Sequence, residues 1–324
     1  MKEKSREYLI IALGNIMVLV LLIWFFGGMG RKDYSVNQKE QSRLIGASYM
    51  TMNNEFYQII SEEIKARIEA EGDRWVLRDP ALDAGRQKEQ IEEMLDMGID
   101  VLVLTPVDWK GLKNVLEKAR NQGVRIVVVD SDIAEEELAD CTITSDNYQA
   151  GVGMGTYFIS QCPGARVILM THDTAKSGRD RIQGFVDVVS QKPDITIVER
   201  VECDGQLEIA MPRLQELIED GVQFDQVFCL NDLASVGVVA ALEEKEMLNQ
   251  VGVYGIDASP DSKALIKEHM MQATMAQFPS KIGEEAANVI YRLLNDEQVE
   301  KKIRIPVELV TAGNVDEYGI ERWQ

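Results

Sequence analysis

Four polar side chains each follow a predicted apolar strand directly, at the point where that strand ends. Asp130 follows RIVVV, Asn231 follows QVFCL, Asp257 follows VGVYGI and Gln277 follows QATMA. In an open α/β sheet, the carboxyl ends of the strands line the crevice in which ligands bind. Carboxylates accept hydrogen bonds, and carboxamides both accept and donate them. The sequence therefore predicts a cleft that binds a ligand made of hydroxyl groups.

Short apolar strands alternate with amphipathic helices from Leu44 onward. Ten strands are expected, at 44–50, 74–78, 101–105, 125–130, 141–144, 166–170, 194–201, 226–230, 251–256 and 271–276. This alternation predicts parallel sheets with helices on both faces, which is an α/β fold. Ten strands exceed one mononucleotide-binding half, so we expect two Rossmann-like lobes of similar build. A boundary between them fits near Asp146–Asn147, where the fifth strand ends.

The N-terminal region differs from the rest of this acidic chain, whose net charge is −20 over 324 residues. Such a charge repels nucleic acid, so no nucleic-acid partner is expected. Residues 8–26 carry no charge and nearly reach the ~20 residues that a membrane-spanning helix needs. Lys2, Lys4 and Arg6 precede them, which predicts a cytoplasmic N-terminus and an exported body. Their length favours an uncleaved, single-pass signal anchor over a cleaved peptide.

Several kinds of chemistry are not supported by the sequence. The four cysteines form no CxxC pair and there are only two histidines, so no metal site is expected. The sequence does not decide whether Cys141 and Cys162 form a disulfide. His172 could border the cleft, but no G-x-S-x-G elbow accompanies it. The G-x-G-x-G run at 151–155 lies inside a predicted helix, which favours close packing of that helix against the sheet over dinucleotide binding. We therefore expect neither an enzyme nor a bound cofactor.

Eight sequence blocks, taken in their order and with their spacing along the chain, form a recognisable pattern. They are TMNNEFY (51–57), QIEEMLDMGIDVLVLTPVD (90–108), VVVDSD (127–132), TSDN (144–147), GRDRIQGF (178–185), FCLNDLASVG (228–237), VYGIDASPDS (253–262) and ATMAQFPSKIG (273–283). Together they resemble the ribose-binding protein family, the type I periplasmic sugar-binding proteins that serve sugar ABC transporters. The resemblance implies two lobes joined by a three-crossover hinge. It implies an N-terminal lobe at 44–146 plus 279–305 and a C-terminal lobe at 147–278 plus 306–324. The apolar segment described above makes 1–43 a cytoplasmic stub, transmembrane anchor and short stalk.

The same resemblance implies which residues bind the ligand. The implied set is Asn54, Phe56, Tyr57, Asp130, Arg179, Asn231, Asp257 and Gln277. Asn54 would bond sugar hydroxyls, and one of the two adjacent rings would stack on the sugar. Arg181 is expected to be structural. Met50, Ser131 and Gly205 depart from the family pattern, which has an Arg at the second position and an aromatic residue at the third, so the resemblance implies a sugar without specifying ribose.

Structural roles remain open for several of these residues. Tyr57 fits the buried face of the first helix by spacing alone. Asp130 or Asp257 could cap the helix that follows it. Arg179 could form an exposed ion pair with Asp173 or Asp180, which would add little stability.

The resemblance implies capture of a neutral monosaccharide, a pentose or a hexose, on the extracytoplasmic side of the cell membrane. In the usual role of the family, the closed protein hands the sugar to the permease of an ABC transporter. The uncleaved anchor favours an alternative, a membrane-tethered sensor that signals through a membrane histidine kinase. Transcriptional regulators share the fold but need an N-terminal helix-turn-helix, and residues 1–43 hold the apolar segment instead.

Overall fold

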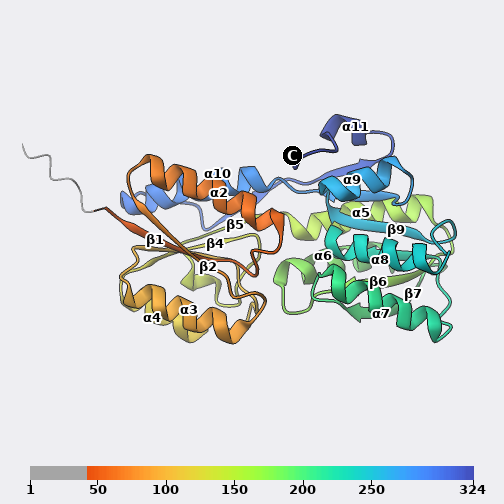
Figure 1. Cartoon of the computed structure of the whole chain (residues 1–324), viewed down its shortest axis with the longest axis horizontal. Helices are drawn as coiled ribbons and strands as arrows, with labels where there is room; N and C mark the ends of the chain where they lie inside the picture. The colour runs from red at the N-terminus through yellow and green to blue at the C-terminus, as the bar shows by residue number, and fades with distance from the viewer. Residues whose placement is uncertain (1–41) are drawn as a thin grey trace, which may run out of the picture. The chain divides into compact units, whose positions relative to one another are not determined.

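Two six-stranded sheets, each at the centre of one lobe, organise the part of the chain that the computed structural model describes, residues 42–324 (Figure 1). The predicted two-lobe α/β fold is confirmed. The predicted membrane segment at 8–26 lies outside the described residues. Among the helices that are described, none has the length and apolar character that a bilayer crossing requires.

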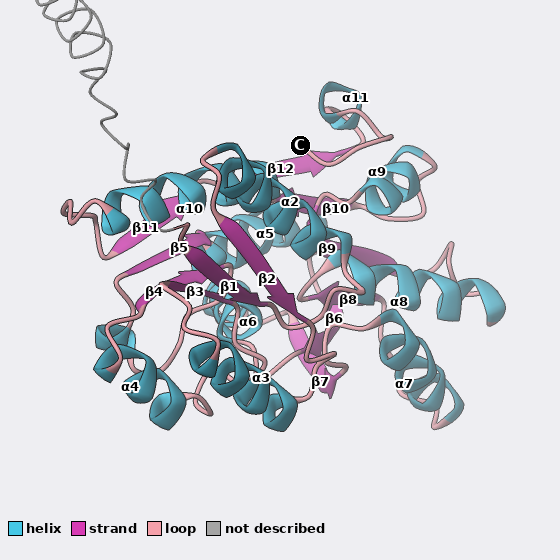
Figure 2. Ribbon diagram, turned by 60° about the vertical axis from the view of Figure 1, so that its left-hand side comes forward, coloured by secondary structure: helices cyan, strands magenta, loops and turns pink. Residues whose placement is uncertain are grey.

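The first lobe is built on the sheet with strand order β11-β5-β4-β3-β1-β2, in which all neighbours are parallel. Its strands are β1 (Leu44–Ser48), β2 (Arg74–Arg78), β3 (Val101–Leu104), β4 (Arg125–Val129), β5 (Cys141–Ser145) and β11 (Lys302–Ile305). The central strands β1, β3 and β4 are mostly apolar and are buried on both faces because helices cover both. One face packs against α2 (Glu55–Ala70) and α10 (Pro279–Leu294), and the other against α3 (Ala84–Asp96) and α4 (Lys113–Asn121) (Figure 2). A 3₁₀ turn, Glu136–Leu138, precedes β5.

The second lobe is built on the sheet with strand order β12-β10-β9-β8-β6-β7. Its strands are β6 (Arg166–Thr171), β7 (Thr196–Glu202), β8 (Gln226–Cys229), β9 (Gly252–Asp257), β10 (Ala273–Ala276) and β12 (Glu308–Thr311). Only β12 is antiparallel to its neighbour in this sheet. Its helices are α5 (Asn147–Gln161), α6 (Lys176–Val189), α7 (Leu207–Glu219), α8 (Asp232–Glu244), α9 (Pro260–Lys267) and α11 (Val315–Tyr318). Helix α5 packs along α6, and α7 along α8.

The chain passes between the two sheets three times. The connections are Asp146 between β5 and α5, residues 277–278 between β10 and α10, and residues 306–307 between β11 and β12. The strands β11 and β12 were not predicted, because KIRI and ELVT are short and partly charged edge strands with little apolar signal. The lobe boundaries predicted from the sequence would fall at these connections, and they stay a prediction.

Small residues bring α5 and α6 into close contact. A Cβ atom at Gly151 would lie 2.0 Å from the carbonyl oxygen of Arg181, and one at Gly184 would lie 2.2 Å from that of Tyr148. The G-x-G-x-G run in α5 thus serves helix packing, but Gly151 and Gly155 meet α6, whereas the sequence predicted packing against the sheet, which only Gly153 contacts through Met275. The contact matters for the site described below, because it fixes the position of α6, which carries Arg181.

Gly151→Ala should destabilise the protein by about 1–3 kcal/mol, because the new methyl group meets main chain that cannot move aside. Urea unfolding followed by circular dichroism measures the loss. Gly153→Ala in the same helix is the matched control, since its Cβ would meet only the flexible end of the Met275 side chain, at 3.0 Å. Equal stability of the two variants would contradict this account of the packing.

Candidate ligand-binding site

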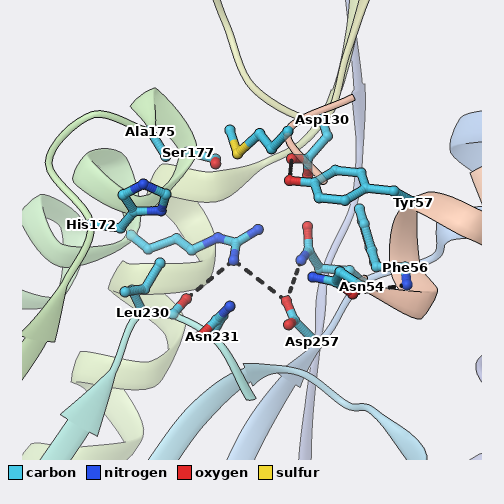
Figure 3. Close-up of a pocket in the computed structure, with 13 residues that line it drawn as sticks. Asn54, Phe56, Tyr57, Asp130, His172, Ala175, Ser177, Leu230, Asn231 and Asp257 are labelled. Carbon is cyan, nitrogen blue, oxygen red and sulfur yellow. Dashed lines mark hydrogen bonds and ion pairs between the residues drawn. The ribbon is translucent and has the colours of Figure 1, made fainter. Parts of the chain in front are cut away.

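A pocket lies where the carboxyl ends of strands from both lobes meet (Figure 3). It is lined by Met50, Asn54, Phe56, Tyr57, Asp130, His172, Ala175, Ser177, Arg181, Leu230, Asn231, Asp257 and Gln277. All of the predicted site residues except Arg179 are among them. The strand-end rule accounts for Asp130, Asn231, Asp257 and Gln277 at this pocket, and the family resemblance accounts for Asn54, Phe56 and Tyr57. That these residues bind a ligand stays a prediction.

Asp130 is the first-lobe acid of the pocket. It directly follows β4, has a positive φ of 66° and is only 3% exposed. One carboxylate oxygen accepts a hydrogen bond of 3.0 Å from the Tyr57 hydroxyl. Burial raises the pKa of Asp130, and the positive charge of Arg181 opposes that shift. Asp130 caps no helix, so its open structural alternative is wrong.

The first turn of α2 supplies three further pocket residues (Figure 3). Asn54 is the N-cap of this helix, and its side-chain oxygen accepts a 3.0 Å hydrogen bond from the Phe56 amide. The cap engages the oxygen of Asn54, which leaves its amide nitrogen to donate toward the pocket.

The aromatic rings of this turn are buried against one another. Phe56 meets Tyr57 edge to face with ring centroids 5.7 Å apart, and Tyr57 stacks on Tyr49 at 5.9 Å. Tyr57 belongs to the hydrophobic core, in agreement with the alternative prediction that it lies on the buried face of the first helix. Its hydroxyl nevertheless reaches Asp130 in the pocket, so it serves both purposes.

Asp257 is the second-lobe acid, at the end of β9 with φ of 142°. It accepts hydrogen bonds from the Gln277 amide at 2.5 Å, and from Arg181 and the Asp232 main chain at 3.4 Å each. Burial and the neighbouring Asp232 carboxylate raise the pKa of Asp257 to about 7, while Arg181 lowers it. The cap of the next helix is Ser259, so the capping alternative for Asp257 is wrong.

Gln277 donates a hydrogen bond to Asp257 and offers the pocket a further acceptor. Its amide nitrogen donates to Asp257, but its side-chain oxygen is buried and has no hydrogen-bond partner within residues 42–324. A buried acceptor left unpaired costs free energy. A ligand hydroxyl in the pocket would supply the missing donor.

Arg181 is the cation of the pocket and is 4% exposed. Its Nε donates to the Asn147 side-chain oxygen at 2.8 Å, and its Nη1 donates to the Leu230 carbonyl at 3.1 Å. The same Nη1 lies 3.4 Å from an Asp257 carboxylate oxygen. A buried guanidinium requires such pairing, and the fork of remaining N–H groups is the strongest donor set in the pocket.

The prediction that Arg179 contributes to the pocket, with Arg181 merely structural, is wrong. Two residues along an α-helix turn a side chain by roughly 200°, so the two arginines point in nearly opposite directions. The Arg179 side chain is 47% exposed and lies 3.9 Å from Asp173. Its guanidinium also stands 5.9 Å from the ring centre of Trp109. The surface ion pair with Asp173, its structural alternative, is what the structure contains.

Asn231 lines the pocket, yet its hydrogen bonds are made inside its own lobe. It is the N-cap of α8, where its side-chain oxygen accepts from the Ala234 amide at 3.0 Å. Its amide nitrogen donates to the Gly205 carbonyl at 3.0 Å. Gly205 has a φ of 63°, and a Cβ there would lie 3.0 Å from that nitrogen. The glycine therefore allows the main chain to approach Asn231 closely.

The predicted set omits six of the lining residues: Met50, His172, Ala175, Ser177, Arg181 and Leu230. His172 directly follows β6, so the strand-end rule applied to that strand would have found it. Burial lowers the pKa of His172, and its Nε2 lies 2.9 Å from the Thr174 hydroxyl. The apolar Met50, Ala175 and Leu230 carry no chemical signal in the sequence.

The open question of a disulfide is answered by the positions of the cysteines. All four thiols are free. Cys141 opens β5 in the first sheet, whereas Cys162 ends α5 in the second lobe and lies 3.0 Å from the Tyr254 hydroxyl. The two residues therefore do not form the bridge that their spacing left open.

Comparisons with known proteins agree with this geometry. Residues 45–298 match the family described as periplasmic binding protein domain. The ribose import binding protein of Bacillus subtilis is 28% identical over 281 residues, covering 86% of this chain and 89% of the relative. The D-apiose import binding protein of Paraburkholderia graminis is 23% identical, and the match covers 85% of this chain and 89% of that relative.

Solved structures share the fold. A solute-binding protein of Mycobacterium smegmatis with bound glycerol superposes with a TM-score of 0.80 at 27% identity, covering 86% of this chain and 96% of that one. A solute-binding protein of Bacillus halodurans with bound myo-inositol also superposes with a TM-score of 0.80. It is 23% identical, and the match covers 86% of this chain and 97% of that one. Because the family match spans most of the chain and its relatives are sugar-import binding proteins, this protein belongs to the type I periplasmic sugar-binding protein family.

Proposed function

We propose that this protein binds a neutral monosaccharide, a pentose or a hexose, between its lobes and delivers it to a sugar ABC importer. The supporting observation is the composition of the pocket. Carboxylates of Asp130 and Asp257 and the unpaired oxygen of Gln277 offer acceptors, and Arg181 and Asn54 offer donors. Sugar hydroxyls both donate and accept, so they can pair with both sets at once.

An apolar surface complements these polar groups. The ring of Phe56 lines the pocket, and Met50 and Leu230 add further apolar lining. The C–H face of a sugar ring packs well on such a surface. Each hydroxyl that pairs with a buried group raises specificity, since a sugar lacking it leaves that group unpaired at ~1–3 kcal/mol.

Closure of the lobes is the proposed binding step. The pocket leaves a volume of about 40 Å³, which suits a few water molecules rather than a sugar. A sugar must therefore reach the site while the lobes stand apart, and it becomes enclosed when they rotate about the three connections. The closed form, with both lobes in contact with the ligand, is the form that we propose the importer recognises.

Isothermal titration of the purified full chain against aldopentoses, aldohexoses and their deoxy forms tests the proposal. We expect one or a few sugars to bind with micromolar dissociation constants, which correspond to a binding free energy of about −8 kcal/mol. The absence of binding by every neutral sugar in the panel would reject it.

Asp130→Asn should weaken the binding of that sugar by about tenfold. The substitution keeps the shape of the side chain but replaces one acceptor oxygen by a donor, so one buried hydroxyl pairing is lost. The same titration measures the change. Asp132→Asn is the control, because Asp132 lies near the Lys302 ammonium instead of lining the pocket. Unchanged affinity in Asp130→Asn would remove this carboxylate from the binding set.

A second function is favoured by the apolar segment at 8–26, which lies outside the described residues. We propose that, if this segment remains as a membrane anchor, the binding domain stays on the extracytoplasmic surface and can report its ligand state to a membrane histidine kinase. The intact mass of protein extracted from membranes shows whether the segment is retained. Crosslinking in membranes then distinguishes a permease partner from a kinase partner.

A further inference from the structure

The last residues of the sequence cross from one lobe to the other beside the pocket. Tyr318, the last residue of α11, and Ile320 pack against the hydrophobic core of the second lobe. Trp323 packs against the core of the first lobe. Figure 1 shows this end of the chain, marked C, near α10 and α11. A segment of a few residues thus contacts both lobes, in addition to the three connections of the hinge.

On the first-lobe side, Trp323 supports a ring that lines the pocket. Its ring centroid lies 5.6 Å from that of Phe56, at an interplanar angle of 62°. Its indole N–H donates a 2.8 Å hydrogen bond to the Glu55 carboxylate, which fixes the indole at the start of α2. Phe56 therefore has the ligand pocket on one side and Trp323 in edge contact with its ring.

On the second-lobe side, Gln324 binds the main chain of two pocket residues. Its amide nitrogen donates to the carbonyl of Asp257 at 2.8 Å and to the carbonyl of Gln277 at 2.6 Å. The fully buried Lys263 holds the segment in place, since its ammonium donates to the Arg322 carbonyl at 2.6 Å and to the Gln324 side-chain oxygen at 3.0 Å. The side chain of Gln324 thereby links the main chain of Asp257 to that of Gln277.

We propose that Trp323 and Gln324 are positioning residues of the ligand pocket. Trp323 holds the Phe56 ring against the ligand from the first lobe, and Gln324 fixes the strand ends that carry Asp257 and Gln277 in the second. The inference deepens the proposed function and rests on it for the identity of the ligand. Neither residue lines the pocket, so both act through the groups they contact.

Hydrogen–deuterium exchange of the ligand-free full chain tests the positioning role without any sugar. Trp323→Ala should speed amide exchange in the first turn of α2, and Gln324→Ala should speed exchange of the Gln277 and Phe278 amides, each by about five- to tenfold. Tyr318→Phe is the matched control, because its hydroxyl bonds Glu308 within the second lobe and should leave both regions unchanged. Unchanged exchange in the first two variants overturns the proposal.

Titration with D-ribose and D-fucose tests the consequence for binding. Trp323→Ala should weaken the affinity for whichever probe binds by about tenfold, and Trp323→Phe should restore most of it, because an aromatic ring still supports Phe56. Unchanged affinity in Trp323→Ala also overturns the proposal. If neither probe binds the parent chain, these two ligands are rejected and the exchange experiment alone decides the positioning role.

Discussion

Arg181→Ala is expected to abolish measurable sugar binding, whereas Arg179→Ala should bind as the parent protein does. The two residues lie in the same block and the same helix, but only Arg181 lines the pocket. Its guanidinium is the strongest donor set available to the ligand, and it also pairs with Asp257 at 3.4 Å. Removing it costs the ligand its charged partner and leaves a buried carboxylate without one, so we expect a loss of at least about 100-fold in affinity.

The same substitution should destabilise the fold, by about 3–5 kcal/mol, because one member of a buried ion pair is removed. Urea unfolding measures this loss independently of any ligand. Arg181→Lys separates folding from binding, since it keeps the positive charge but loses the bidentate fork. We expect this variant to fold and to bind weakly. Binding at parental affinity by Arg181→Ala would exclude Arg181 from the site.

The pocket could be located from the sequence because of a general property of parallel sheets. Asp130 follows β4 in the first sheet and Asp257 ends β9 in the second, and within each sheet the carboxyl ends of parallel strands share one edge. Placing the two acids together also required the two facing lobes that the family resemblance implies. His172 after β6 obeys the same rule, and its position agrees with the expectation that it could border the cleft.

The choice between Arg179 and Arg181 required the phase of the helix. Matching a two-arginine block to a family cannot decide which arginine points inward. The information was present in the sequence, because Gly178, Ile182 and Phe185 are spaced as one buried face, and Arg181 lies on that face. Helical periodicity would therefore have corrected the assignment that the resemblance made.

Other features depend on distances that no local pattern contains. Asn231 was correctly placed at the pocket, but only the structure shows that its oxygen and nitrogen are used by Ala234 and Gly205. The return of Trp323 to the first lobe was likewise invisible. Its neighbours in the sequence are polar and give no period from which to infer a partner. Strand ends are set by topology, whereas such contacts are set by packing.

Asp257 should make the stability of the protein fall as the pH rises from 4 to 7. Its ordinary pKa is 3.8, and burial together with Asp232 raises it to about 7 in the folded protein. Between these values the folded state binds a proton that the unfolded state releases, so folding is favoured most at the acidic end. As the pH rises through 7 the buried carboxylate must ionise, and up to about 4 kcal/mol of its contribution is lost.

Asp257→Asn isolates this contribution because the amide does not titrate. We expect the parent protein to lose stability relative to the variant between pH 4 and pH 7, as measured by urea unfolding at each pH. Asp130 and Asp232 also have raised pKa values, so the variant should keep part of the slope. Asp173→Asn changes a carboxylate that is 71% exposed and should leave the slope intact. A pH profile shared by the parent and Asp257→Asn would mean that Arg181 keeps Asp257 ionised throughout. The ion pair would then dominate over burial, and the ligand would meet a permanent negative charge at this position.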